Sequence, residues 1–451
     1  MREIYSLLML LLQPLLRAKL RKRGQQEPGY LERMEERWGD YKQLDGAGQP
    51  HSHVWNESSL AYRPTLWIHA VSLGETRAAA VLLRELRQGL PGMRLLLTHG
   101  TATGRAEGKA LLQDGDRQVW LPWDTPQAVD RFLRRFMPEM GILIETEVWP
   151  NLVAACKDRR IPLLLVNARL SEKSLRQAHR LSWLARPAYR SLTAVYAQTH
   201  ADAGRLTELG ARVADVFGNL KFDAKPAPQL LQLGQLWRKA WQESLTQPKG
   251  VIVFASSREG EEAIFLKLLA DMPPVQRQSV QWLIVPRHPQ RFNEVADMVL
   301  AAGLSLLRRS RWDQPMEGVP PGKTGPASVS AEVWLGDSLG EMAAYFALAD
   351  LALLGGSFLP LGGQNLIEAA ACGCPVIMGP HTFNFAEAAQ NSAQAGAAFV
   401  VTDLAEGVST AMDMLQKQEL LNQCRYAATA FLKQHQGATR KTVAAIVARA
   451  R

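Results

Sequence analysis

Glu75 has the sequence context of a general base at the start of a helix. The apolar run 66–71 breaks at Ser72, and a helical pattern follows. Gly74 permits a tight turn, Ser72 can cap the new helix, and Glu75 then lies in the first helical turn. There the helix dipole favours an ionised carboxylate, which can accept a proton from a hydroxyl group. The same Ser-x-x-Glu spacing is that of a capping box, in which Glu75 binds the backbone, so both uses stay open.

Glu145 and Glu147 end another strongly apolar run, 141–144. If the strand stays extended, both carboxylates lie on one face at its carboxyl end, where the active sites of parallel sheets gather. Two neighbouring charges need partners, so either one suits a substrate hydroxyl or an arginine. The alternative for Glu147 is an exposed loop residue. Lys221, in the sequence GNLKFD, is expected to reach towards an anion, and its alternative is a solvated lysine beside a linker.

Glycines and a helix start in the second half predict a nucleotide subsite. Two glycine pairs follow the apolar run 351–354, and a helical pattern begins after Asn365. Bare backbone amides such as that of Gly356, next to a helix start, suit a phosphate group. One turn later, Glu368 can accept hydrogen bonds from ribose hydroxyls. Arg287, which ends a further apolar run, offers a forked guanidinium group to a phosphate or a carboxylate.

Other kinds of chemistry lack their signatures. Neither a Walker A lysine nor a Gly-x-Gly-x-x-Gly sequence follows the strand–helix junction at 255–262, which argues against an NTPase or a dehydrogenase. The histidines at 69, 99 and 381 stand singly, without the spacing of a metal site, so we expect no metal and no cofactor. Four cysteines are too few for a disulfide scaffold and indicate a reducing compartment.

These residues need elements that bring the ends of several strands together. Short apolar runs alternate with helical patterns such as 75–87 and 126–136, which predicts parallel α/β sheets. The runs expected to form strands are 66–71, 94–98, 118–121, 141–145, 162–166, 194–198 and 213–217, then 251–255, 282–286, 304–307, 333–336, 351–354, 375–378 and 398–401.

A Pro-rich stretch divides this pattern into two domains. The sequence KPAP at 225–228 predicts a linker between a domain at 25–225 and a second domain at 226–451. We expect two Rossmann-like, doubly wound domains that face a cleft, with ligands at the carboxyl ends of the strands. The last helix, 439–450, either stays with the second domain or crosses back to the first. Weakly patterned stretches at 43–64 and 308–326 are expected to be surface insertions.

The amino terminus and the charge distribution both point to an anionic partner. The apolar run 4–16 would rise only about 20 Å as a helix, less than the hydrocarbon thickness of a membrane of about 30 Å, and most of the charge follows it. We therefore predict a membrane anchor with a basic collar at 1–24, lying in the interface on the cytoplasmic side. The alternative is a helix that docks on the fold.

All of the excess positive charge lies in the first half of the chain. Residues 1–225 carry 33 basic and 24 acidic side chains, whereas the remaining residues carry 19 of each. A basic half predicts a lobe that faces a membrane, a phosphorylated substrate or nucleic acid. Signatures of nucleic-acid binding are not apparent, so we expect no nucleic-acid partner.

Together these stretches resemble the 3-deoxy-D-manno-octulosonic acid (Kdo) transferase family of lipopolysaccharide biosynthesis. The resemblance covers nearly the whole chain and rests on the ordered motifs WIHAVSLGET, ETEVWP, GNLKFD, SREGEE, VPRHP, GDSLGEM and GGSFLPLGGQNLIEAA…GPHTFNF. It implies the two-domain glycosyltransferase-B (GT-B) fold and an inverting, metal-independent enzyme. The implied donor is CMP-Kdo, the implied acceptor is a lipid A precursor (lipid IVA), and the implied location is the cytoplasmic side of the cell inner membrane.

The resemblance also assigns residues by position. Glu75 matches the catalytic base of the family, and Asn365 belongs to a segment, Gln364-Asn365-Leu366, that usually reads His-Asn-Pro. Two other functions stay open: another GT-B glycosyltransferase or nucleotide-sugar epimerase, and a non-enzymatic peripheral membrane protein that binds glycolipid. The expected acceptor site is Ser72 and Gly74 from the helix start, with Arg105, Glu145 and Lys221, and the expected CMP-sugar site is Arg287, Gly356, Asn365 and Glu368.

Overall fold

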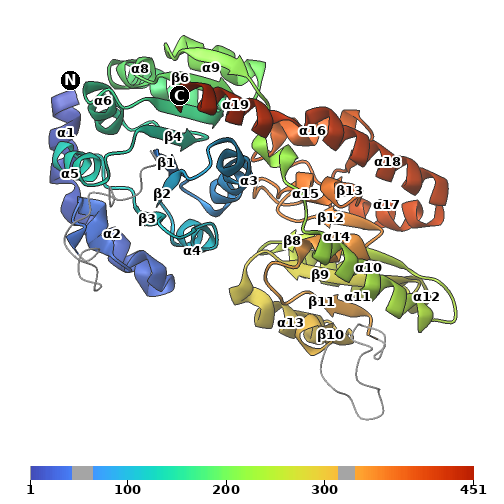
Figure 1. The fold of residues 1–451 in the computed structure, drawn as a ribbon. Helices are drawn as coiled ribbons and strands as arrows, with labels where there is room; N and C mark the ends of the chain where they lie inside the picture. The colour runs from blue at the N-terminus through green and yellow to red at the C-terminus, as the bar shows by residue number, and fades with distance from the viewer. Residues whose placement is uncertain (1, 43–63, 313–330, 451) are drawn as a thin grey trace. The chain divides into compact units, whose positions relative to one another are not determined.

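The computed structural model describes residues 2–42, 64–312 and 331–450, which form two compact units (Figure 1). Unit 1 comprises Met1–Asp223 and Gln436–Arg451, and unit 2 comprises Ala224–His435. In the described part of the chain, each unit has a parallel sheet of seven strands with helices packed on it.

The sheet of unit 1 has the strand order β3-β2-β1-β4-β5-β6-β7, and all neighbouring strands are parallel. Residues Leu66, Trp67 and Ile68 of β1 are fully buried, as expected for a strand with helices on both faces. The chain order reverses between β1 and β4, so the loops after these two strands flank the position where ligands bind in sheets of this kind. The strands are β1 (Thr65–His69), β2 (Arg94–His99), β3 (Arg117–Trp120), β4 (Met140–Ile144), β5 (Leu163–Ala168), β6 (Ala194–Ala197) and β7 (Val213–Val216).

Several helices of unit 1 begin at a side chain that accepts a hydrogen bond from one of their first backbone amides. Ser72, Thr101 and Thr125 each accept a hydrogen bond from the amide three residues further on. The helices are α1 (Arg2–Leu11), α2 (Gln13–Gln26), α3 (Leu73–Gly89), α4 (Ala102–Lys109), α5 (Pro126–Phe136), α6 (Pro150–Asp158), α7 (Glu172–Arg180), α8 (Ser182–Arg190), α9 (His200–Glu208) and α19 (Ala438–Ala450), with 3-10 turns η1 (Pro28–Tyr30), η2 (Met34–Trp38) and η4 (Leu220–Asp223).

The last helix, α19, packs against α3 within unit 1. Val443 and Val447 lie over Gly89, where a Cβ atom would come within 3.4 Å of both side chains. The carboxylate of Asp223 accepts hydrogen bonds from the amides of Gly437 and Thr439, both at 2.6 Å, and so satisfies the start of the helix. The carboxyl terminus is thereby fastened to the loop that contains Lys221.

The first helix docks on unit 1 by one side and exposes apolar side chains on another. Ser6 donates a hydrogen bond to Asn151 at 3.0 Å, so α1 is held on α6. Ile4, Leu7 and Leu11 remain 59–68% exposed. Helix α1 therefore docks on the fold, as one alternative expected, and also exposes an apolar surface. Its contact with a membrane stays a prediction. Within the described residues, every helix is too short or too polar to cross a bilayer.

The sheet of unit 2 has the order β10-β11-β9-β8-β12-β13-β14, again with parallel neighbours. Its core contains Phe254, Trp282 and Leu353, which are all fully buried. Here the chain order reverses between β8 and β12. The strands are β8 (Gly250–Ser257), β9 (Val280–Pro286), β10 (Leu306–Arg308), β11 (Val333–Leu335), β12 (Leu351–Leu354), β13 (Val376–Met378) and β14 (Ala398–Val400).

Helix α10 packs closely on α14 at the start of unit 2. A Cβ atom at Gly234 would lie 2.2 Å from the carbonyl oxygen of Ala344, so only glycine allows this approach. The helices are α10 (Pro228–Glu243), α11 (Glu261–Asp271), α12 (Pro274–Gln278), α13 (Phe292–Ala301), α14 (Met342–Leu348), α15 (Leu366–Ala371), α16 (Ala386–Gln394), α17 (Leu404–Gln416) and α18 (Gln418–His435), with 3-10 turns η5 (Pro289–Arg291) and η6 (Arg309–Arg311).

The two doubly wound sheets confirm the predicted fold class. All fourteen strands expected from the sequence occur in the described residues, with ends within two residues of the prediction. Both sheets are parallel because strand and helix alternate along the chain. Most of the two expected insertions, 43–64 and 308–326, lies outside the described residues; the start of the second contributes the end of β10 and η6.

Candidate active site

Glu75 closes the loop between β1 and α3 with its carboxylate. Oε2 accepts a hydrogen bond from the Val71 amide at 2.8 Å, and Oε1 accepts one from the Ser72 hydroxyl at 3.0 Å. The Ser72 oxygen in turn accepts from the Glu75 amide at 3.3 Å. The capping box that the spacing allows is therefore present, although the reach back ends at Val71 rather than at the amide of the cap residue itself.

The pKa of Glu75 is raised from its usual 4.5 to about 7. Burial is the main cause, because it disfavours the charged form, and repulsion from Glu145 and then Glu147 adds to it. The hydrogen bonds from Val71 and Ser72 act in the opposite direction. A carboxylate that titrates near neutral pH is well suited to general-base catalysis, because it is basic and yet ionised for part of the time.

Gly74 is the second residue of α3 and is exposed on the surface of the helix start. A Cβ atom there would meet only the Ser72 hydroxyl, at 3.9 Å, and its φ is not positive. The prediction of a tight turn at Gly74 is therefore wrong, since the residue already lies within α3. Neither packing nor backbone geometry requires glycine here, and its small size leaves the helix start open to a ligand next to Glu75.

The end of β4 turns Glu145 and Glu147 towards different partners. Glu145 has a φ of +67°, so the strand does not stay extended and the shared face predicted for the two carboxylates is wrong. Oε1 of Glu145 accepts from Lys221 Nζ at 2.8 Å, and both side chains are largely buried. Glu147 accepts from the Trp149 indole at 2.8 Å, and burial raises its pKa. Lys221 is therefore paired with Glu145. Neither of the two environments expected for it, an anion-binding site or bulk solvent, fully describes its surroundings.

Asn167 links Glu145 to the loop that carries Lys221. Its Oδ1 accepts from the Leu220 amide at 3.0 Å, and its Nδ2 donates to Glu145 at 3.4 Å. The residue is 2% exposed and has a φ of +52°, which asparagine tolerates better than most residues. Sequence reasoning missed Asn167, although a polar residue at the end of the apolar run LLLVNA was a usable signal.

Arg105 is buried in a wall of unit 1 and pairs with Glu36. Its Nη1 donates to Glu36 Oε2 at 3.0 Å, and the guanidinium carbon lies 4.7 Å from the centre of the Trp120 ring. Glu36 also accepts from the Trp120 amide at 2.8 Å. The sequence placed Arg105 among the acceptor-binding residues; in the structure its charge holds η2 against β3, while Ser72, Glu75, Glu145 and Lys221 gather at the β1 and β4 loops.

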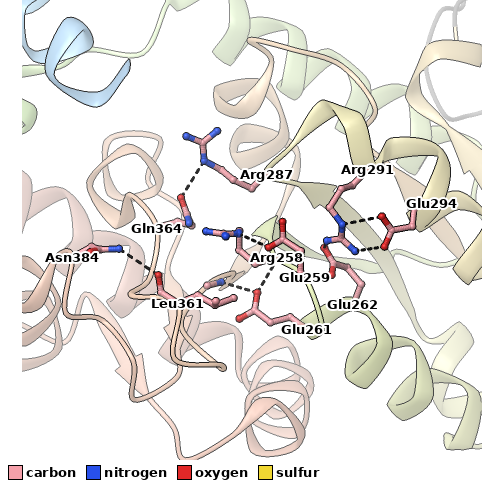
Figure 2. A network of polar contacts seen from close by, with 11 residues as sticks. Arg258, Glu259, Glu261, Glu262, Arg287, Arg291, Glu294, Leu361, Gln364 and Asn384 are labelled. Carbon is pink, nitrogen blue, oxygen red and sulfur yellow. Dashed lines mark hydrogen bonds and ion pairs between the residues drawn. The ribbon is translucent and has the colours of Figure 1, made fainter. Parts of the chain in front are cut away.

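On unit 2, Arg287 and Arg258, from the loops after β9 and β8, lie on two sides of Gln364 (Figure 2). Arg287 Nε donates to the side-chain oxygen of Gln364 at 3.2 Å. Figure 2 shows the Arg258 guanidinium beside the same glutamine, and Arg258 also donates to Glu259 at 2.8 Å. Two guanidinium groups next to one amide form a suitable receptor for a phosphate. Arg258 was not among the residues expected from the sequence, although it lies in the SREGEE motif.

The glycine loop after β12 is occupied by a side chain of the same unit. Gly356 adopts a φ of +70°, and its amide donates to Glu261 Oε2 at 2.7 Å. The amide of Phe358 donates to Glu261 Oε1 at 3.1 Å. These two amides are therefore not bare, which corrects the expectation that the loop offers them to a phosphate.

Asn365 and Glu368 lie at the start of α15. Asn365 is the N-cap residue, and its Oδ1 accepts from the Ile367 amide at 3.2 Å. Glu368 is in the first turn and is partly buried. Asn365 directly follows Gln364 in the chain, and Gly356 is linked to the same segment through a hydrogen bond from the Gly363 amide to the Gly356 carbonyl at 2.7 Å.

The geometry of each unit can be compared with known proteins. Residues 32–224 match the family described as 3-Deoxy-D-manno-octulosonic-acid transferase (kdotransferase). A 3-deoxy-D-manno-octulosonic acid transferase of Bordetella pertussis is 45% identical over 389 residues, 84% of this chain and 86% of that protein. The protein of that name from Haemophilus influenzae is 31% identical over 98% of this chain and 96% of its own length. The crystal structure of Anabaena HepE in complex with UDP aligns with a TM-score of 0.55 at 15% identity, over 86% of this chain and all of that one, and this likeness places the fold in the GT-B class.

Proposed function

We propose a function for this chain from one premise: it belongs to the 3-deoxy-D-manno-octulosonic acid (Kdo) transferase family, and it is a glycosyltransferase of that family. The proposed reaction transfers Kdo from CMP-Kdo to a lipid A precursor (lipid IVA) in lipopolysaccharide biosynthesis, with inversion at the anomeric carbon. The observation that carries the proposal is Glu75, a half-buried carboxylate with a pKa of about 7 at the switch point of the first sheet.

Unit 1 is the proposed acceptor-binding unit, because its surface charge suits a phosphorylated lipid. Residues 157–190 contain nine basic and two acidic side chains, and α7 within this stretch has no buried residue. A lipid A precursor offers anionic groups to such a surface. The exposed apolar side chains of α1 and the basic α2 support a place on the cytoplasmic side of the inner membrane, with the amino terminus lying in the interface.

Unit 2 is the proposed donor-binding unit. Arg287 and Arg258 provide charge for the single phosphate of CMP-Kdo. Glu368 is proposed to accept hydrogen bonds from ribose hydroxyls, and Asn365 and Gly356 are proposed to line the loop beside the nucleotide. CMP-Kdo is a substrate, so no resident cofactor is proposed.

The proposed chemistry is a single displacement. Glu75 takes the proton from a hydroxyl of the acceptor sugar as its oxygen forms a bond to the anomeric carbon of Kdo. The bond from that carbon to the phosphate oxygen of CMP breaks, and its electron pair leaves with the phosphate. Positive charge near the leaving phosphate lowers the barrier, and Arg287 and Lys221 are the assigned candidates. Repulsion from the Glu145 carboxylate also raises the pKa of Glu75, which sustains its basicity.

The decisive test is product analysis. Purified protein is incubated with CMP-Kdo and lipid IVA, and the glycolipid is weighed by mass spectrometry; a mass gain of one or more Kdo units supports the proposal. A Glu75→Gln variant that still transfers within tenfold of wild type removes Glu75 as the base, since a general base typically contributes about 10²–10⁴-fold. Transfer from UDP-sugars but not CMP-Kdo, or sugar interconversion without acceptor, favours another GT-B enzyme. If the protein floats with vesicles that contain the glycolipid but produces no transfer product, a non-enzymatic glycolipid-binding protein is favoured.

A further inference from the structure

We infer that Glu261 is a positioning residue for the donor site of unit 2. Its carboxylate fastens the loop after β8 to the loop after β12, and so holds Arg258 and Gly356 in the arrangement that receives the donor phosphate. The inference rests on the proposed function, which places the donor in this unit.

The carboxylate of Glu261 joins three backbone amides from two loops. Oε2 accepts from the Arg258 amide at 3.0 Å and from the Gly356 amide at 2.7 Å, while Oε1 accepts from the Phe358 amide at 3.1 Å. Glu261 is the first residue of α11 and is fully buried. Figure 2 shows its side chain directly below Arg258 and Glu259. Water does not compete for these two oxygens, because the side chain of Glu261 is fully buried.

An ionised carboxylate is the group that this position requires. It only accepts hydrogen bonds, and here three N–H donors converge on its two oxygens. The amides of Gly356, Arg258 and Phe358 stabilise the charged form and oppose the rise in pKa that burial causes. A glutamine of the same shape would turn an NH₂ group towards one of these donors, which leaves a buried N–H without an acceptor and pushes one loop away.

The arrangement also decides which groups remain for the phosphate. Since the amides of Gly356 and Phe358 already bind Glu261, recognition passes to the side chains around Gln364. Arg258 belongs to the loop that Glu261 holds. Its Cγ lies 3.6 Å from the point where a Cβ atom on Gly356 would be. Arg287 Nε binds Gln364 at 3.2 Å, and Gln364 Nε2 lies 3.1 Å from that same Cβ position. Release of the two loops at Glu261 would therefore move Arg258 away from Gly356 and from Gln364.

The next residue, Glu262, provides a matched control. It is also in the first turn of α11 and fully buried, but its partner is Arg291, at 2.8 Å. Figure 2 shows Arg291 between Glu262 and Glu294. Replacement of either buried glutamate by glutamine removes one charge from the same helix turn, yet only Glu261 touches the two loops.

The experiment compares Glu261→Gln and Glu262→Gln with wild type in the full-length protein. Three quantities are measured: the melting temperature, the Kd of CMP by calorimetry, and hydrogen exchange of peptides that contain Gly356 and Phe358. We expect Glu261→Gln to raise the Kd of CMP and the KM of CMP-Kdo at least tenfold, to speed exchange in these peptides at least tenfold, and to leave the KM of the acceptor unchanged. Glu262→Gln is expected to change the Kd of CMP less than threefold, whatever its melting temperature.

Each outcome decides something. A Glu261→Gln protein that binds CMP as wild type does, or a Glu262→Gln protein that loses affinity equally, overturns the positioning role. If Glu261→Gln does not fold, Glu261→Asp, which keeps the charge on a side chain one methylene shorter, is measured against the same thresholds. If the wild-type protein fails to bind CMP, the donor assignment of unit 2 is refuted, and with it the claim that Glu261 supports donor binding. If hydrogen exchange is unchanged in Glu261→Gln, the claim that Glu261 fastens the two loops is refuted separately.

Discussion

Replacement of Glu75 by glutamine should abolish transfer and at the same time stabilise unit 1 at alkaline pH. The folded protein keeps Glu75 protonated up to about pH 7, whereas the unfolded chain releases this proton near pH 4.5. Ionisation between these two values therefore favours the unfolded state, and the wild-type protein loses stability as the pH rises through this window. Glutamine has no proton to lose, so the variant escapes this loss.

The size of the effect follows from the shift in pKa. A rise from 4.5 to about 7 corresponds to about 3 kcal/mol at most, since one pH unit is worth about 1.4 kcal/mol. Glu75 is only partly buried, so screening by water reduces this to about 1–3 kcal/mol. Glutamine keeps one acceptor for the Val71 amide or the Ser72 hydroxyl and loses the other, which costs about 1 kcal/mol at any pH. The variant is then slightly less stable than wild type near pH 5 and more stable by up to about 2 kcal/mol at pH 8.5.

The assay compares wild type and Glu75→Gln at pH 5 and pH 8.5. Hydrogen exchange of peptides from β1 and α3 reports the local stability, because these elements hold the residue. Transfer is measured on the same preparations and should fall at least about 100-fold. Glu107→Gln is the control, since Glu107 forms an exposed ion pair with Arg77 and should change neither quantity. A stability difference that is the same at both pH values refutes the raised pKa, and transfer within tenfold of wild type refutes the catalytic role.

Three further substitutions test other parts of the structure. Glu145→Gln removes the negative neighbour of Glu75, so the pKa of Glu75 should fall and the rising limb of the profile of kcat against pH should move to lower pH; an unmoved limb contradicts this. Arg105→Ala leaves Glu36 buried without its partner and should lower the unfolding free energy by about 3–5 kcal/mol, a loss that Glu36→Gln in the same chain should partly restore. Asp223→Ala removes the acceptor of two amides and should cost about 1–3 kcal/mol, with faster hydrogen exchange confined largely to α19; unchanged exchange there would show that packing on α3 alone holds the helix.

The fold was predictable because its signals are local. Strand β12 has the bounds expected from its apolar run, Leu351–Leu354, and α5 has the expected bounds Pro126–Phe136. The start of α5 follows from Thr125 as cap and proline at the first position, and its last residues are the end of an amphipathic pattern. Each of these features lies within a few residues of the element that it determines, so no knowledge of tertiary contacts was needed.

The partners of the site residues were not predictable, because they come from distant parts of the chain. Arg105 pairs with Glu36, which lies 69 residues earlier, and the Gly356 amide pairs with Glu261, which lies 95 residues earlier. A guanidinium group or a glycine loop has the same local sequence whether it meets a ligand or a buried carboxylate. Glu145 is a related case, because its partner Lys221 lies 76 residues later and its positive φ ends the run that the sequence predicts to stay extended.

Glu75, the proposed catalytic base, is also the residue that completes the capping box at the start of α3. The bonds from Val71 and Ser72 fix the carboxylate at the helix start, which a base needs in order to meet a substrate hydroxyl in one geometry. By themselves these bonds would lower the pKa and make a weak base. Burial and the charge of Glu145 oppose them and leave the pKa at about 7. The Ser-x-x-Glu spacing alone could not distinguish a capping residue from a base. The capping bonds orient the Glu75 carboxylate, whereas its pKa also depends on Glu145, which lies in the loop after β4.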